Sequence, residues 1–148
     1  MTIPENMMHE IREHAEVVYP EECCGLVLGK TGSPGELTRV RRCKNAQDQF
    51  HKLDPHTFPR TNRNAYFIAP KDLLAVEREC REQKERVRVI YHSHPDVGAY
   101  FSDEDQRCAV VDGEPLHPEV DYLVVSVKDG KAGESVWFEW DSASKSFK

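Results

Sequence analysis

The sequence predicts an α/β fold of the α+β type, in which a mixed β-sheet is packed between helices. Apolar residues at helical spacing alternate along the chain with short apolar runs that are typical of strands. The chain has 148 residues, of which 39% are hydrophobic and 31% charged, enough to bury one core. We therefore expect a single domain over residues 1–148.

The first part of the chain predicts a helix followed by a pair of strands. Residues 6–18 carry apolar side chains at spacings of three and four, and the helix is expected to end at Tyr19-Pro20. The apolar run 24–30 predicts a buried strand. Residues 37–43 predict its hairpin partner, across a turn at residues 31–35.

The middle of the chain is less regular. Residues 45–64 show little periodicity and predict a long loop, and a loop of that length is usually functional. A short strand is expected over residues 65–68. Pro70 stands at the start of a predicted helix that reaches about residue 84, since proline is tolerated in the first turn.

The next strand carries the residues of most chemical interest at its end. Residues 87–92 predict a strand with Val87, Val89 and Tyr91 on one face. Residues 95–101 predict the loop that follows this strand.

The last part of the chain predicts one helix and two strands. Residues 102–111 predict the helix, which we expect to stop near Gly113. Residues 122–128 and 136–140 predict strands, with a turn beginning at Asp129-Gly130.

Composition excludes several classes of protein. The 20 Lys and Arg against 26 Asp and Glu give a formal charge of −6, which argues against a general nucleic-acid binder. No apolar run approaches the roughly 18 residues of a membrane span. The first 18 residues lack the apolar core of a signal peptide, and five cysteines without a CxxC pair do not suggest a disulfide framework. We expect a cytoplasmic protein that binds neither membrane nor nucleic acid.

Charge is distributed unevenly along the chain. Residues 36–64 hold seven basic and three acidic side chains, a local charge of +4, whereas residues 96–148 hold five basic and twelve acidic ones, a charge of −7. The basic segment is consistent with an acidic protein partner or with a solvated strand edge, and the sequence leaves both open.

Potential metal ligands are concentrated in residues 91–105. His92 and His94 are two residues apart at the end of a predicted strand, so their rings lie on the same side of the sheet. Asp105, in the first turn of the next helix, offers an oxygen ligand. Three protein ligands and a water are the arrangement of a catalytic zinc, which acidifies that water and polarises a carbonyl.

Each of these residues also has a purely structural interpretation. Ser102-x-x-Asp105 fits a helix N-cap with an acid at the third helical position. Two histidines at a strand end can simply form hydrogen bonds within a loop. Spacing alone therefore leaves the metal site and the structural interpretation open.

Two blocks of the sequence resemble the JAMM motif of the MPN-plus metalloproteases. The pattern is a distant Glu followed by H-[ST]-H-P-x6-S-x2-D. Residues 19–29 (YPEECCGLVLG) are similar to the family's segment around that Glu, which identifies Glu22, with Glu21 as the neighbouring alternative. The second block is matched at six positions: His92, Ser93, His94, Pro95, Ser102 and Asp105.

The resemblance implies a single MPN/JAMM domain, cytidine-deaminase-like in fold, and a role for each residue. His92, His94 and Asp105 would hold one Zn²⁺ per chain, with a bound catalytic water. Glu22 would act as general base on that water and pass a proton to the leaving amine. Ser102 would donate a hydrogen bond to the developing oxyanion.

Two neighbouring residues are not expected to take part in the chemistry. Ser93 points to the other face of the predicted strand, so we expect it to pack. Cys23 stands beside Glu22, but no histidine partner is indicated, and the metal mechanism needs no nucleophilic thiol.

The chain resembles the small stand-alone prokaryotic members of that family in size and in the segments around residues 45–48 and 66–72. Those relatives process ubiquitin-like sulfur-carrier proteins that end in Gly-Gly. The resemblance therefore implies a metalloisopeptidase that releases an amino acid such as cysteine, a peptide or a conjugated lysine. The sequence leaves open whether the protein forms a homodimer. The 45–64 loop and the basic run 39–44 would then bind the carrier's tail as an added strand.

The other histidines are expected to be peripheral. His9 and His14 are predicted at the surface of the first helix. His51 and His56 fall in the predicted loop, where contact with substrate stays open.

Two other functions compete with the peptidase. A non-catalytic MPN-type scaffold for protein complexes usually lacks one of the motif residues, whereas this chain has all of them. A zinc nucleobase deaminase needs H-x-E and P-C-x-x-C, and this chain has His94 two residues after His92 and no C-x-x-C.

Overall fold

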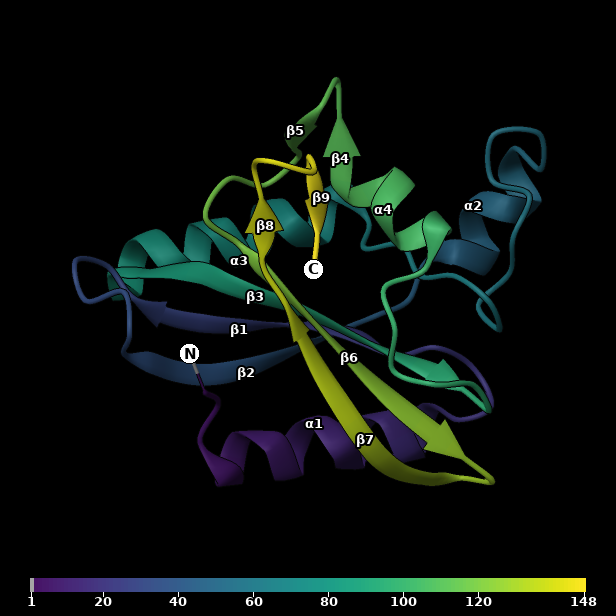
Figure 1. Cartoon of the computed structure of the whole chain (residues 1–148), viewed down its shortest axis with the longest axis horizontal. Coiled ribbons are helices and arrows are strands. Elements are labelled where there is room, and N and C mark those ends of the chain that lie inside the picture. The colour runs from purple at the N-terminus through teal and green to yellow at the C-terminus, as the bar shows by residue number, and fades with distance from the viewer. Residues whose placement is uncertain (1) are drawn as a thin grey trace.

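A computed structural model describes residues 2–148 and contains a central mixed sheet of five strands (Figure 1). The strand order is β2-β1-β3-β6-β7, and only β3 and β6 run parallel. The strands are β1 (Cys24–Lys30), β2 (Leu37–Cys43), β3 (Glu85–Pro95), β6 (Asp121–Lys128) and β7 (Lys131–Phe138).

Helices cover both faces of this sheet (Figure 1). Helix α1 (Glu5–Val18) packs on one face, while α3 (Pro70–Gln83) and α4 (Asp103–Ala109) pack on the other. A short helix, α2 (Gln47–Leu53), lies to one side of the sheet. The fold class predicted from the sequence is confirmed.

Two small hairpins complete the described structure. Strand β4 (Val110–Val111) pairs with β5 (Glu114–Pro115), and β8 (Trp140–Asp141) pairs with β9 (Ser146–Phe147). No helix among residues 2–148 is long and apolar enough to cross a bilayer.

Each face of the sheet has its own apolar core, because alternate strand residues point to opposite faces. The core under α1 consists of Met7, Met8, Ile11, Ala15, Cys23, Val27, Val89, Tyr91, Leu123, Val125 and Val127. The core under α3 and α4 consists of Cys24, Leu26, Leu28, Ile68, Val76, Cys80, Ile90, Ala109, Val120, Tyr122 and Phe147. This burial on both faces explains why the central strands appear in the sequence as continuous apolar runs.

The predicted long loop and short strand in the middle of the chain are wrong. Residues 47–53 form α2, and residues 65–68 are irregular chain without a strand partner. The rings of Phe50, Phe58 and Phe67 lie 4.9–5.3 Å apart and hold this segment together. A helix of two turns held by distant aromatic contacts is too short to produce a visible periodicity.

The predicted face of Val87 is also wrong. Val89 and Tyr91 lie in the core under α1, but Val87 packs against the opposite core. The pairing of β1 with β3 shifts register here, because Val27 pairs with Val89 while the next residue, Leu28, pairs with Val87. Such a bulge reverses the alternation of the strand, and nothing in the local sequence signals it.

The elements near the C-terminus differ from prediction at two tight turns. The helix predicted to reach residue 111 ends at Ala109, because Val110 and Val111 form a hairpin across Asp112-Gly113, whose φ angles are 51° and 76°. The strand predicted at 136–140 instead begins at Lys131, directly after a second Asp-Gly turn at residues 129–130, and ends at Phe138.

His14 was expected at the helix surface but is buried, with 7% of its area exposed. Its Nδ1 lies 2.7 Å from the hydroxyl oxygen of Tyr91, across the core under α1. Burial lowers the pKa of His14 to about 4, so the imidazole is neutral at pH 7. Gly25, on β1 opposite Tyr91, leaves the space that the tyrosine ring occupies.

We expect Gly25→Ala to lower the free energy of unfolding by about 1–3 kcal/mol through overpacking. A Cβ at this position would lie 2.3 Å from the Tyr91 hydroxyl oxygen, so the ring would have to move and the contact with His14 would be lost. Urea denaturation followed by circular dichroism would measure the change.

Gly133→Ala is the matched control, because a Cβ there has no heavy atom within 4 Å. It should change stability by less than about 0.5 kcal/mol. Equal effects of the two substitutions would contradict the packing argument.

Candidate metal centre

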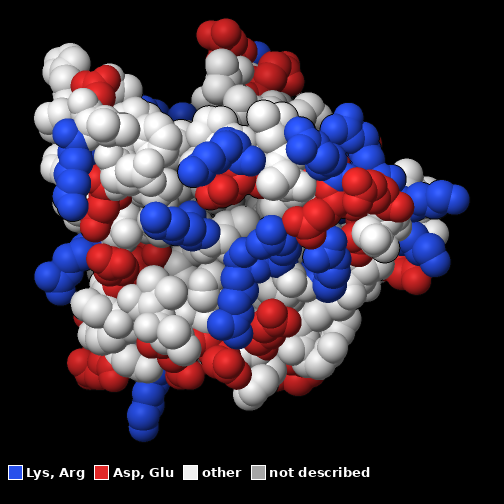
Figure 2. Space-filling model, turned by 180° about the vertical axis from the view of Figure 1, so that it is seen from behind, with Lys and Arg blue, Asp and Glu red and all other residues white. Residues whose placement is uncertain are grey.

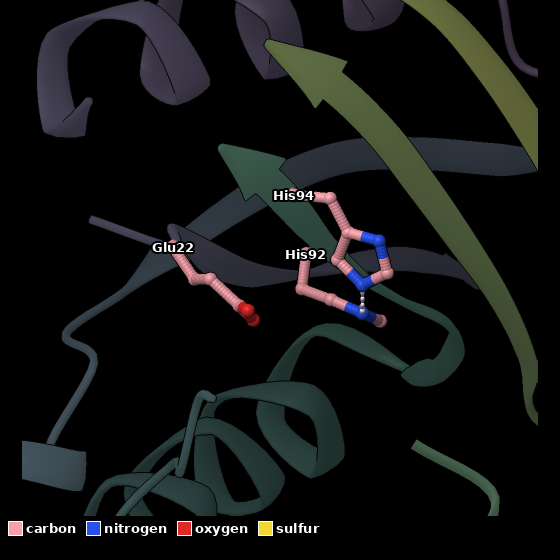
Figure 3. A group of neighbouring side chains, drawn as sticks. All are labelled: Glu22, His92 and His94. Carbon is pink, nitrogen blue, oxygen red and sulfur yellow. Dashed lines mark hydrogen bonds between the residues drawn. The ribbon is translucent and has the colours of Figure 1, made fainter. Parts of the chain in front are cut away.

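The end of β3 places two imidazoles side by side. Tyr91 and Ser93 face α1, and the residues that alternate with them, His92 and His94, face the other side of the sheet as predicted. His92 is fully buried and His94 is 4% exposed. Their Nε2 atoms lie 3.2 Å apart (Figure 3).

Helix α4 begins beside these rings and adds a carboxylate. The Asp105 Oδ2 lies 3.1 Å from His92 Nε2 and 3.2 Å from His94 Nε2. Ser102 is the N-cap: its Oγ accepts from the Asp105 N–H, and its own N–H donates to Asp105 Oδ2, each at 3.0 Å. The helix-cap interpretation is therefore confirmed, and the same cap fixes Asp105 against the two histidines.

These separations fit a shared metal ion. Ligands at zinc–nitrogen distances of 2.0–2.1 Å in a tetrahedral shell are about 3.3 Å apart. The three donor atoms stand at 3.1–3.2 Å from one another. Glu22, His92 and His94 also form a group whose donor atoms all lie within 4.8 Å and which can hold a metal.

The protonation states favour metal binding at two of the three side chains. Burial acts to raise the pKa of Asp105, but the two imidazoles and the Ser102 N–H outweigh it and hold the pKa well below its usual range. Burial lowers the pKa of His92. For His94 burial acts the same way, but its hydrogen bond with Asp105 raises the pKa overall, so metal binding there would release a proton.

Contacts behind the rings set their orientation. His94 Nδ1 lies 3.1 Å from the Gly98 carbonyl, and donation to that oxygen leaves Nε2 of the neutral ring free to bind a metal. The ring of Tyr66 stacks on His92 at 4.4 Å and 25°, and His92 Nδ1 has no hydrogen-bond partner within the described chain. Nothing in the sequence around Tyr66 indicates this long-range contact.

Glu22 faces the imidazoles from just before β1 (Figure 3). Its N–H donates to the Asn62 carbonyl at 2.7 Å, and its carbonyl accepts from Asn45 Nδ2 at 2.9 Å. The side chain is 5% exposed, and Oε1 has no hydrogen-bond partner among residues 2–148. Burial raises the pKa of Glu22 to about 8, against the attraction of His94. With this pKa the carboxyl group mostly holds its proton at pH 7, and a cation beside it would favour the carboxylate form.

Three neighbours of Glu22 behave differently from it. Glu21 Oε1 accepts from Asn62 Nδ2 at 3.4 Å, and Glu21 is not part of the group that could hold a metal. Ser93 Oγ accepts from the Cys23 N–H at 2.8 Å on the α1 side of the sheet, which ties the chain after Glu22 to β3. Burial raises the pKa of the Cys23 thiol to about 12, which makes it a poor nucleophile.

A cleft of about 180 Å³ opens in front of these groups. Its walls are formed by Glu22, Arg60, Arg63, Asn64, His94, Pro95, Val97, Tyr100 and Ser102. Because Ser102 Oγ accepts from the backbone of α4, its hydroxyl proton is left to donate to another group. Arg60 and Arg63 were predicted only as part of a basic segment, and their place in the cleft depends on the fold of residues 54–65.

Other candidate binding residues are occupied within the fold. In the basic run 39–44, Arg39 pairs with Glu79 and Glu85, and Arg41 pairs with Glu79. Figure 2 shows basic and acidic side chains interspersed on the face seen from behind. His51 Nδ1 lies 2.7 Å from the Phe58 carbonyl, and neither His51 nor His56 lines the cleft.

Comparison with known proteins agrees with this fold and site. A family model described as prokaryotic homologs of the JAB domain matches residues 4–141, and the chain belongs to this family. The resemblance to JAMM proteins is thereby confirmed.

Two curated relatives, both named CysO-cysteine peptidase, come from Mycobacterium tuberculosis and Mycobacterium bovis. Each is 26% identical over 129 residues, which cover 87% of this chain and 75% of the relative. The chain therefore has a peptidase among its relatives.

Two solution structures share the fold. A protein from Salinibacter ruber matches with a TM-score of 0.67 and 26% identity, over 100% of this chain and 87% of that one. A protein from Desulfitobacterium hafniense matches with a TM-score of 0.64 and 23% identity, over 90% of this chain and 78% of that one.

We expect Asp105→Asn to lower bound zinc from about one ion per chain to less than about 0.1, because it removes the anionic oxygen beside both imidazoles. Metal content would be measured by mass spectrometry after dialysis against metal-free buffer. Asp103→Asn removes the same charge from the first turn of the same helix, at an exposed position, and should keep the metal. Stoichiometric zinc in the Asp105 variant would refute the ligand assignment.

Proposed function

We propose that this chain is a zinc-dependent metallopeptidase that hydrolyses the amide bond after the C-terminal Gly-Gly of a ubiquitin-like or sulfur-carrier protein. The observation that carries the proposal is a cluster of three donor atoms, from His92, His94 and Asp105, that lie 3.1–3.2 Å from one another. The carboxyl group of Glu22 faces this cluster with one oxygen free of hydrogen bonds among residues 2–148. Membership of the JAB family and relatives named as peptidases support a hydrolase.

His92, His94 and Asp105 would hold the metal. When bound, a zinc ion supplies Lewis acidity, which polarises the scissile carbonyl and acidifies a water. The protein contributes a site that is closed on the sheet side by buried side chains and open toward the cleft.

Glu22 would move the proton. As a carboxylate it takes a proton from the attacking water while the new carbon–oxygen bond forms. It then gives that proton to the leaving amine as the carbon–nitrogen bond breaks. Its burial and its free oxygen suit this transfer, since no other group of the described chain competes for that oxygen.

Ser102 would stabilise the developing negative charge on the carbonyl oxygen. Its hydroxyl oxygen accepts from the Asp105 N–H at the helix cap and lines the cleft, so the O–H remains available to donate to a group bound there. Preorganisation of this kind costs nothing at the moment of reaction.

A sulfur-carrier substrate is supported by the relatives. Their name, CysO-cysteine peptidase, describes proteins that act on cysteine joined to CysO. A Gly-Gly end also suits a narrow cleft, because only glycine lets a backbone approach so closely. The chain has every side chain of the motif, which favours an enzyme over a non-catalytic scaffold.

We expect the zinc-loaded protein to cleave a Gly-Gly-terminated ubiquitin-like carrier that bears one added amino acid, and a chelator to abolish the cleavage. Intact mass spectrometry would report the loss of the added residue, and zinc added after removal of the chelator should restore it. Cleavage that persists in the chelator would refute the metal mechanism.

We expect Glu22→Gln to keep the metal and to lower kcat/KM about 100- to 10,000-fold, because the amide preserves the shape but cannot accept the proton. Zinc content and kcat/KM would be measured on the same preparation. Glu21→Gln is the matched control and should stay within about threefold of the unsubstituted protein. The opposite pattern would move the base to Glu21.

A further inference from the structure

Two arginines line the cleft beside Glu22, both from the segment that follows α2. Arg60 lies 3.4 Å from a Glu104 oxygen through Nε, and its Nη1 donates to the Asn64 carbonyl at 3.2 Å. Arg63 is exposed and forms no ion pair within 4.0 Å among residues 2–148, although its charge helps to lower the pKa of Asp96, which lies outside the cleft walls. An unpaired guanidinium therefore stands at the mouth of the proposed active site.

The turn that carries Arg63 is held in a fixed position. Asp48 and Asn62 exchange two hydrogen bonds of 2.8 Å, from each backbone N–H to the side-chain oxygen of the other. The Asn62 carbonyl accepts from the Glu22 N–H at 2.7 Å. The residue before Arg63 is thus hydrogen-bonded to the backbone of Glu22, although Arg63 and Glu22 are 41 residues apart in the sequence.

The cleft walls carry more basic than acidic side chains. Of the residues in its walls, Arg60 and Arg63 are cations and Glu22 is the one carboxylate. Glu104 lies behind Arg60, but it also pairs with Arg107, so one carboxylate is shared between two guanidinium groups. An anionic group of the substrate would complete this arrangement.

We propose that Arg63, assisted by Arg60, binds the α-carboxylate of the leaving group, so that the released group is a single free amino acid. This inference rests on the proposed peptidase function and names its substrate class. Glu22 delivers its proton to the leaving amine, and in an α-amino acid the carboxylate carbon is two bonds from that nitrogen. The carboxylate would therefore lie in the same cleft of about 180 Å³ as Glu22, whose walls include both arginines.

A lysine of a conjugated protein would not satisfy the same site. Its side chain presents methylene groups where an amino acid presents its carboxylate, and Arg63 would lose hydration without gaining a partner. Val97 and Tyr100, with 43% and 51% of their areas exposed, offer apolar surface on the cleft wall to the side chain of a released amino acid.

The test compares two carriers that differ in one charge. A ubiquitin-like carrier with one alanine after Gly-Gly would be prepared as the free acid and as the carboxamide. We expect the unsubstituted enzyme to favour the acid about 5- to 10-fold in kcat/KM, the upper range for a charge pair between exposed groups, because both arginines are exposed. Arg63→Gln should remove this preference by slowing the acid and leaving the amide within about threefold, and Arg63→Lys should restore part of it.

Arg78→Gln is the matched control. Arg78 is exposed on α3, away from the cleft, so its loss should leave both substrates unchanged. An acid-to-amide ratio near one in the unsubstituted enzyme, or equal losses on both substrates in Arg63→Gln, would overturn the carboxylate site. If both carriers were cleaved at equal rates, the carboxylate site would be overturned while the proposed peptidase function would be supported.

A binding measurement separates the two proposals if neither carrier is cleaved. Calorimetry on the zinc-loaded Glu22→Gln variant would then compare its affinities for the acid and the amide. Tighter binding of the acid, lost on Arg63→Gln, would support the carboxylate site although the peptidase proposal had failed. Equal or undetectable binding would overturn the carboxylate site as well.

Discussion

The pairing of β1 with β3 is the interaction on which the rest of the site depends. Cys24 lies opposite His92, and Cys23 exchanges two hydrogen bonds with Ser93, one through the serine hydroxyl and one between the backbones. These bonds bring Glu22 to the imidazoles from 70 residues away. A slip of one residue would turn both histidines toward α1 and leave the cleft without its proposed metal ligands.

The site is built at a cost in stability that a cation would offset. Four ionisable side chains, Glu22, His92, His94 and Asp105, are each no more than 7% exposed. Burial opposes the charged form of every one of them, and a divalent ion among them would favour the carboxylates and the neutral imidazoles. The helix cap adds a smaller contribution, since the negative charge of Asp105 lies in the first turn of α4.

Local rules predicted the parts of the structure that local sequence determines. The two-residue spacing places His92 and His94 on one face, and Ser102 and Asp105 form the cap that their spacing predicts. The bulge beside Val87 and the burial of His14 against Tyr91 were missed, because each depends on a strand or helix distant in the sequence. The structure brings together the residues that the family motif identifies, which single-residue propensities could not have done.

Chemistry and selectivity are placed on different kinds of structure in this chain. The proposed ligands are on a central strand and a capped helix, whereas Arg60 and Arg63 are on an irregular segment held by side-chain amides such as Asn62. Substitution of Arg60 or Arg63 would alter the charge of the cleft at exposed positions outside the strand and helix that carry the proposed ligands. Relatives of this fold can therefore share one hydrolytic centre and differ in the leaving group they accept. In this chain the proposed carboxylate site depends on Arg63, which lines the same cleft as the proposed base and forms no ion pair among residues 2–148.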